Sequence, residues 1–197
     1  MDRLNSFISE IIINEGGFQN DAKDKGNYYN GKLYGTVYGI TARDNFDAFS
    51  VVYNLYKHGF IDSAKSLAIN FYSTDKTFLH KYWNPLYNNI IDSSLAFRIF
   101  DFGINAGKFR AVKLLQRTIN KIPIIKKIKE DGIFGEITLS YINSLSAPDK
   151  DNIETEFYYL YVQTLEDYYK SLWNFFKFGS GWIARVKRIF NKIPNLK

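Results

Sequence analysis

Residues 3–19 read RLNSFISEIIINEGGFQ, and this stretch decides how the chain begins to fold. Apolar side chains recur in it at helical spacing, which predicts an amphipathic helix near residues 3–14. The members of this apolar stripe are Leu4, Phe7, Ile8, Ile11 and Ile12. Gly16 and Gly17 follow the stripe and supply a stop signal for the helix.

Glu15 stands out because it continues the apolar stripe. It follows Leu4 by eleven positions. Because each residue of a helix turns by about 100°, the side chain of Glu15 is expected to point within about 20° of the direction of the Leu4 side chain. A carboxylate on a buried face is rare unless it is paired or functional. Desolvation and the negative end of the helix dipole are both expected to raise its pKa, which suits a general acid. The structural alternative is an ion pair with an arginine of another helix, such as Arg98 or Arg185.

Two stretches beyond Glu15 could complete a site. Asp21 and Asp24 lie in the polar loop that follows, where a second carboxylate could face the first across a groove. Hydrolysis of a glycosidic bond uses such a pair, and the spacing of the two groups decides the stereochemistry. Residues 35–41, GTVYGIT, then predict a strand in which glycine would let a substrate approach the backbone and a threonine hydroxyl could orient a water.

The remaining pattern predicts an α+β fold that is mainly α-helical. Asn30-Gly31 between Tyr28-Tyr29 and residues 32–34 predicts a β-hairpin, the one place where we expect a sheet. From about residue 44 onward the periodicity is helical. Predicted helices cover roughly residues 44–57, 62–72, 75–90, 93–105, 108–120, 136–146, 150–176 and 182–192. We expect a first region at 1–92 and a second, helical region at 93–197 packed on it.

Composition narrows the classes of function. Apolar residues make up 46% and charged residues 23%, so a hydrophobic core is possible and global disorder is not. The absence of cysteine excludes disulfides and thiol nucleophiles. His58 and His80 lack metalloprotease spacing, so no metal is expected. A net charge of +6 favours an anionic partner, which could be nucleic acid, a membrane surface or the bacterial wall.

Three motifs taken together resemble glycoside hydrolase family 108. They are Glu15-Gly16-Gly17-Phe18, Asp24-Lys25-Gly26-Asn27 and Gly35-Thr36-x-x-Gly39-Ile40-Thr41. The family consists of N-acetylmuramidases found as phage endolysins and in bacterial secretion or lysis cassettes. The second half also resembles the family's C-terminal peptidoglycan-binding region, in stretches that include residues 101–107, DFGINAG, and 131–135, DGIFG. The resemblance covers nearly the whole chain, but extra residues around 28–34 depart from the shorter family pattern.

The resemblance implies a lysozyme-like fold with a small β-hairpin lobe and assigns three catalytic residues. Glu15 would be the catalytic acid. Asp24 follows it by nine positions, the spacing of phage-type lysozymes, and would be the second carboxylate, with Asp21 as the alternative. Thr36 is assigned the role of the catalytic threonine, although the extra residues leave Thr41 as an alternative.

Four further residues are expected to contact substrate. They are Tyr38, Thr41, Asp101 and Asn105. Asp101 and Asn105 are four residues apart and share a helix face, so the alternative is that they cap and brace the bend at 103–107. The segment 182–197 is amphipathic and basic, and either docks on the core or lies on a membrane surface.

We therefore expect a lysozyme-like muramidase, of class EC 3.2.1.17, that hydrolyses the β-1,4 bond between N-acetylmuramic acid and N-acetylglucosamine in peptidoglycan. A phage endolysin for host lysis is the leading interpretation. The alternatives are a bacterial muramidase that remodels the wall for protein or toxin release, and a non-catalytic wall-binding protein. A nucleic-acid-binding protein is supported by charge alone.

The partner and compartment follow from the same interpretation. We expect a monomer that acts on peptidoglycan glycan strands without a cofactor, without nucleic acid and without stable membrane insertion. The sequence has no signal-peptide pattern and no apolar run of about 18 residues. The expectation is a protein kept in the host or bacterial cytoplasm, released through a separate protein such as a holin, and active on the wall in the periplasm.

Overall fold

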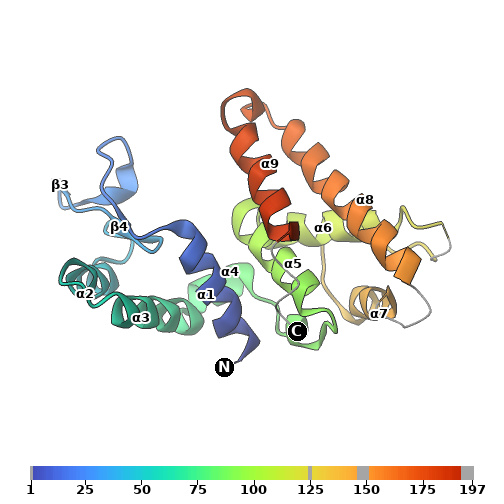
Figure 1. The fold of residues 1–197 in the computed structure, drawn as a ribbon, viewed down its shortest axis with the longest axis horizontal. Coiled ribbons are helices and arrows are strands. Elements are labelled where there is room, and N and C mark those ends of the chain that lie inside the picture. The colour runs from blue at the N-terminus through green and yellow to red at the C-terminus, as the bar shows by residue number, and fades with distance from the viewer. Residues whose placement is uncertain (1, 124–125, 146–150, 192–197) are drawn as a thin grey trace. The chain divides into compact units, whose positions relative to one another are not determined.

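The computed structural model describes residues 2–123, 126–145 and 151–191, with the side chains of residues 14–15, 151–153 and 188–191 outside the description. The chain forms two compact units, Met1–His80 and Lys81–Lys197. Helices dominate both units and short antiparallel strands occur in the first (Figure 1). This confirms the prediction of a mainly helical α+β fold. Within the described residues, no helix is long and apolar enough to cross a membrane.

The first helix forms as its apolar stripe predicts. Helix α1 (Arg3–Glu15) is capped by Asp2, whose side chain accepts a hydrogen bond of 2.9 Å from the backbone N–H of Asn5. The helix ends at Gly16, whose φ of 79° favours a residue without a side chain. The stripe packs on α3 (Ile61–Thr74), and α3 also packs on α2 (Phe46–Lys57). The buried residues of the α1 stripe are Phe7, Ile8, Ile11 and Ile12.

The strands form two small sheets in the first unit. Strands β2 (Tyr28–Tyr29) and β3 (Lys32–Leu33) form the hairpin predicted from Asn30-Gly31. A second, three-stranded sheet has the order β1 (Phe18–Gln19), β4 (Thr36–Val37) and β5 (Ile40–Thr41). The expectation of one sheet and of a single strand over residues 35–41 was therefore wrong. The chain reverses at Tyr38-Gly39, where both residues have positive φ. Tyrosine is not one of the residues that usually occupy such a position, so the sequence does not predict this turn.

The second unit is an assembly of helices around α5. Its elements are the 3-10 helix η2 (Pro85–Asn89), α5 (Ser93–Ala106), α6 (Lys108–Ile119), α7 (Glu136–Leu145), α8 (Asp151–Lys170) and α9 (Phe175–Asn191). Every residue from 95 to 103 is buried, which places the middle of α5 in the core. Helix α6 packs on both α5 and α8, and α9 packs along α8. Figure 1 shows α8 and α9 as an antiparallel pair joined by a turn.

Three of the predicted helices differ from the structure. The predicted helix at 75–90 is interrupted, because α4 (Lys76–Tyr82) ends before Pro85, which cannot donate a helical hydrogen bond. The predicted helices at 150–176 and 182–192 have wrong bounds, because the chain turns at residues 171–174 and residues 177–181 lie inside α9. A β-carbon added to Gly179 would come within 2.4 Å of the Phe175 ring, so this glycine allows close packing within the helix. Packing of this kind offsets the cost of about 1 kcal/mol for glycine in a helix.

Candidate active site

The three-stranded sheet has an apolar face and a polar face. Phe18, Val37 and Ile40 lie in one cross-strand row, where Val37 and Ile40 are buried. The Phe18 ring lies 4.5 Å from the ring of Tyr53 on α2, which fixes this row to the helical layer. Because side chains alternate along a strand, the neighbouring row faces the other way. That polar row consists of Gln19, Thr36 and Thr41.

Asp24 is exposed, yet its carboxylate is held in one orientation. It caps the 3-10 helix η1 (Lys25–Asn27), and its Oδ1 accepts a hydrogen bond of 2.8 Å from the backbone N–H of Gly26. Its Oδ2 accepts a second hydrogen bond, of 3.0 Å, from Nε2 of Gln19 in the polar row. The carboxylate therefore stays accessible to solvent while two donors fix its position.

Asn27 connects Asp24 to Thr36. Its side chain is fully buried, and its Nδ2 donates to Gln19 Oε1 at 2.8 Å and to the backbone oxygen of Asp21 at 2.9 Å. Its Oδ1 accepts from the hydroxyl of Thr36 at 2.7 Å and from Gln19 Nε2 at 3.1 Å. We call this chain of side chains, Asp24–Gln19–Asn27–Thr36, the Asp24–Thr36 network. A buried amide whose donors and acceptor are all satisfied is expensive to disturb, so the network is rigid.

Gly35 lets the loop and the sheet approach closely enough for this network. Its φ is 128°, and an added β-carbon would lie 2.4 Å from the Phe18 ring and 2.6 Å from the backbone oxygen of Gln19. The backbone N–H of Gly35 also donates to the backbone oxygen of Asn27 at 3.0 Å. A larger residue would push Gln19 and Asn27 away from Thr36.

The two candidate threonines have different partners. Thr41 lies directly opposite Thr36 in the sheet, but its hydroxyl donates to Oδ2 of Asp44 at 2.9 Å. Asp44 also pairs with Arg43 at 2.7 Å, and the hydrogen bond from Arg43 lowers the pKa of the Asp44 carboxyl. Thr36 belongs to the network of Asp24, whereas Thr41 donates a hydrogen bond to the carboxylate of the separate Arg43–Asp44 ion pair.

Glu15 is the last residue of α1, and its side chain lies outside the described part of the structure. Its backbone position follows Ile11 by four residues and Ile12 by three, so it continues the stripe that α1 buries. Asp21, the alternative second carboxylate, is exposed and accepts a hydrogen bond of 2.9 Å from the backbone N–H of Lys23. That bond is a local turn, and the Asp24–Thr36 network uses only the backbone oxygen of Asp21.

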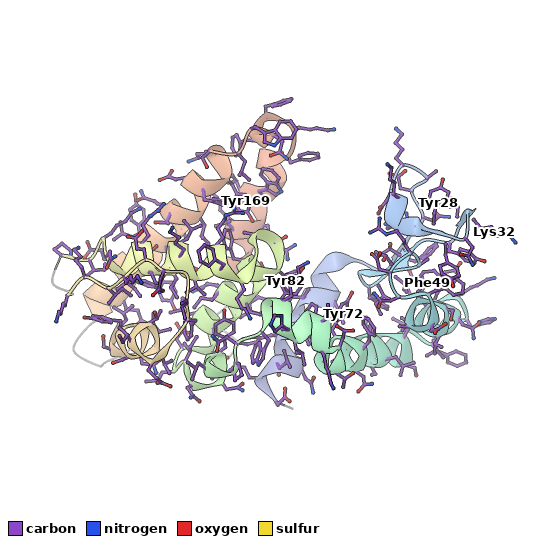
Figure 2. All side chains as sticks on the ribbon, turned by 180° about the vertical axis from the view of Figure 1, so that it is seen from behind. Tyr28, Lys32, Phe49, Tyr72, Tyr82 and Tyr169 are labelled. Atoms are coloured by element: carbon purple, nitrogen blue, oxygen red, sulfur yellow. The ribbon has the colours of Figure 1, made fainter. Side chains whose placement is uncertain are left out.

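Tyr38 is buried, with 4% of its surface exposed. Its ring lies 5.8 Å from the Tyr56 ring in an edge-to-face arrangement, and burial raises the pKa of its phenol. Its backbone oxygen accepts a hydrogen bond of 3.1 Å from the hydroxyl of Tyr72 on α3, which Figure 2 labels. In this position Tyr38 packs the β4–β5 turn on the helices, and a contact with substrate stays a prediction.

Asp101 and Asn105 lie in the second unit and bind to groups of that unit. The Asp101 carboxylate is buried and receives two hydrogen bonds from Arg185 of α9, at 2.6 and 3.2 Å. Asn105 donates from Nδ2 to the backbone oxygen of Asp101 at 2.9 Å. These contacts favour the bracing role that the sequence left open. Arg98, the other arginine considered for Glu15, places its guanidinium 4.6 Å from the centre of the Tyr158 ring.

Gln19 is a member of the network that the sequence did not indicate, and Asn27 was part of the motif Asp24-Lys25-Gly26-Asn27 without an assigned role. Both belong to a polar stretch in which amides are ordinary and carry no periodic signal. Their importance depends on the register that pairs Gln19 with Thr36 across β1 and β4. That register joins residues 17 positions apart, and a strand of two residues is too short to reveal it in the sequence.

Comparisons with known proteins bear on the fold and the family of the chain. No curated protein matches the sequence. Among solved structures, that of Brucella abortus SagA is similar over 95% of this chain and 91% of its own length, with 23% sequence identity and a TM-score of 0.55. This likeness shows a shared fold. The model of the family described as Glycosyl hydrolase 108 matches residues 8–107, more than half of the chain, and includes most of α1 and the whole Asp24–Thr36 network. The protein is thus a member of glycosyl hydrolase family 108.

Proposed function

We propose that this glycoside hydrolase is a muramidase, which cleaves the β-1,4 bond between N-acetylmuramic acid and N-acetylglucosamine in peptidoglycan. The Asp24–Thr36 network is the observation that carries the proposal. It holds an exposed carboxylate and a threonine hydroxyl in one rigid assembly, nine residues after a glutamate at the end of a helix. Such an assembly provides a fixed second carboxylate for glycosidic hydrolysis.

The proposed chemistry divides the work between two carboxyl groups. Glu15, protonated, would donate its proton to the glycosidic oxygen as the bond to the sugar breaks. Asp24 would then act on the anomeric carbon. It would either deprotonate a water that attacks this carbon, or attack it directly to form a glycosyl ester that a water then hydrolyses. The hydroxyl of Thr36 donates its proton to Asn27, so its oxygen is left as an acceptor that can orient a water.

Mass spectrometry of the muropeptides released from purified peptidoglycan tests the proposed bond. We expect products that carry N-acetylmuramic acid at the reducing end, with the mass of one added water. Products with N-acetylglucosamine at the reducing end, or anhydro-muramic acid products, would contradict the assignment. Absence of any released fragment would favour the alternative of a wall-binding protein.

Asp24→Asn should lower the turnover number at least ~100-fold, the lower end of the range for acid–base groups. The substitution removes the carboxylate charge, while Asp21→Asn makes the same chemical change in a carboxylate outside the network. We expect Asp21→Asn to be much milder. Turnover is measured on purified peptidoglycan with the melting temperature as a check on folding. If Asp21→Asn were the more damaging change, the second carboxylate would have been assigned to the wrong residue.

Thr36→Val should reduce the turnover number by about 10- to 100-fold, the range for a displaced positioning group. Valine keeps the shape of threonine but removes one of the two hydrogen bonds to Asn27 Oδ1, at a cost of about 1 kcal/mol in stability. Thr41→Val is the matched control in the facing position of β5. A larger loss of turnover in Thr41→Val than in Thr36→Val would transfer the threonine role to Thr41.

The biological setting rests on the family resemblance. A phage endolysin that is released through a separate protein such as a holin remains the leading interpretation, and a bacterial muramidase that remodels the wall is the alternative. Wall binding by the second unit is likewise a prediction. Residues 131–135 of that unit present Ile133 with 67% of its surface exposed, and Ile137 of α7 is 69% exposed. Apolar side chains at this exposure are available for a binding surface.

A further inference from the structure

The positive charge of the chain is concentrated at its C-terminal end. Residues 168–197 contain seven lysines and arginines and neither aspartate nor glutamate. Residues 1–167 contain nineteen basic and twenty acidic residues, so they carry a net charge of −1. The net charge of +6 therefore arises entirely from the last thirty residues. An acid-free cationic segment is a feature that attracts anionic surfaces.

Three exposed aromatic side chains lie in the same segment, at the turn between α8 and α9. The exposed fractions are 87% for Trp173, 86% for Phe176 and 45% for Phe178. We call these three residues the aromatic tip. Trp173 lies in the turn, and Phe176 and Phe178 lie in the first turn of α9. Figure 1 shows that the turn joins α8 and α9 at the end of the pair remote from α7. Large aromatic side chains this exposed contribute little to the core of the unit, and such exposure is typical of a surface that binds a ligand, a partner or a membrane.

An aromatic contact that involves neither Trp173 nor Phe176 joins α8 to α9 next to the turn. The ring of Trp182 on α9 stacks on that of Tyr169 on α8, with 5.2 Å between the ring centres (Tyr169 is labelled in Figure 2). The Phe178 ring lies 5.8 Å from Trp182. The contact of Phe175 with Gly179 closes the first turn of α9. Trp173 and Phe176 can therefore be exchanged without removing the contacts that join α8 to α9.

Lysines flank the aromatic tip. The ammonium group of Lys177 lies 5.0 Å from the centre of the Phe178 ring. Lys170 and Lys187 are mostly exposed, and both approach Glu166, at 3.4 and 4.0 Å. Lys170 also lies 3.9 Å from the carboxylate of Asp167. Exposed ion pairs of this kind are weak and screened by salt. The cationic group that the structure places directly beside an exposed ring is that of Lys177.

We propose that the aromatic tip binds the surface of an anionic lipid bilayer. Trp173, Phe176 and Phe178 would enter the interfacial zone, where aromatic rings are favoured, while the lysines meet the lipid headgroups. A glycan strand fits less well, because a sugar-binding site combines stacking rings with polar side chains in a concave groove. The tip instead lies at the end of a helical pair, with Lys170 at the end of α8 and Lys177 at the start of α9. The binding is peripheral and does not depend on the proposed hydrolytic function.

Co-sedimentation of the full-length protein with lipid vesicles tests the proposal. We expect binding to vesicles of phosphatidylethanolamine and phosphatidylglycerol in a 3:1 ratio, weaker binding in high salt, and little binding to phosphatidylcholine. Trp173→Ser/Phe176→Ser should lower the partition coefficient about tenfold or more. The matched control is Phe60→Ser/Phe109→Ser, which removes two other exposed aromatic rings and should leave binding unchanged. Lys177→Glu should lower binding about fivefold or more, whereas Lys32→Glu should not.

Two readouts separate this proposal from its rivals. Vesicles should shift the tryptophan emission to shorter wavelength, and Trp173→Phe should remove that shift while binding persists. Unchanged melting temperatures of the tip variants would show that folding is intact. Equal binding to phosphatidylcholine, or wild-type vesicle binding by Trp173→Ser/Phe176→Ser, would overturn the proposal. Loss of binding to insoluble peptidoglycan in that variant, with vesicle binding unchanged, would assign the tip to the glycan instead.

Discussion

Glu15→Gln should abolish peptidoglycan hydrolysis while the protein stays folded. Glutamine has nearly the same shape as glutamic acid but cannot donate the proton that the leaving sugar oxygen needs. Loss of a general acid costs about 10²- to 10⁴-fold in rate, and we expect the upper end because the proposed mechanism offers no second acid. The melting temperature should be unchanged or raised, since burial of an ionisable group is costly. Clearing of purified peptidoglycan and thermal unfolding are the two measurements.

Glu10→Gln is the matched control for this prediction. It makes the same chemical change in the same helix, five positions earlier and away from the end of α1. We expect it to keep nearly all of the activity. A Glu15→Gln protein that hydrolyses peptidoglycan at the wild-type rate would remove Glu15 from the catalytic role. Loss of activity accompanied by a lower melting temperature would instead indicate the structural ion pair that the sequence left open.

The helical part of the fold could be predicted because its signals are local. The spacing of Phe7, Ile8 and Ile12 marks the buried face of α1, and Gly16 marks its end. Asn30-Gly31 predicts the β2–β3 hairpin for the same reason, because a two-residue turn of this type needs positive φ at both positions. In each case a few neighbouring residues contain the whole signal.

The three-stranded sheet and the network on it depend on contacts that no local pattern contains. The pairing of Gln19 with Thr36 joins residues 17 positions apart across strands of two residues each. Asn27 is fully buried although it lies in a polar loop, because its partners come from Gln19, Asp21 and Thr36. Sequence spacing identified Asp24 and Thr36 separately, whereas only the register shows that one chain of hydrogen bonds connects them.

The same distinction applies to Asp101. A carboxylate in the middle of a buried helix raises two hypotheses, substrate contact and bracing, and the sequence cannot choose between them. The structure supplies the partner, Arg185, which is 84 positions away and lies on α9. The two hydrogen bonds between them connect the central helix of the second unit to its last helix. This geometry predicts that loss of the Arg185 side chain lowers the free energy of unfolding by a large amount.

Arg185→Ala should lower the free energy of unfolding by about 3–5 kcal/mol, the range for loss of one partner of a buried ion pair. The side chain of Asp101 is 4% exposed, so the substitution leaves its charge buried without the bidentate guanidinium that now faces it. Arg117→Ala is the matched control, because Arg117 pairs with Glu130 at 3.2 Å and both side chains are largely or partly exposed. Its cost should be about 1 kcal/mol or less. Urea unfolding of both variants measures the difference. An equal cost in the two variants would mean that the Asp101–Arg185 pair does not connect α5 to α9, and Asp101 would again be a candidate for substrate contact.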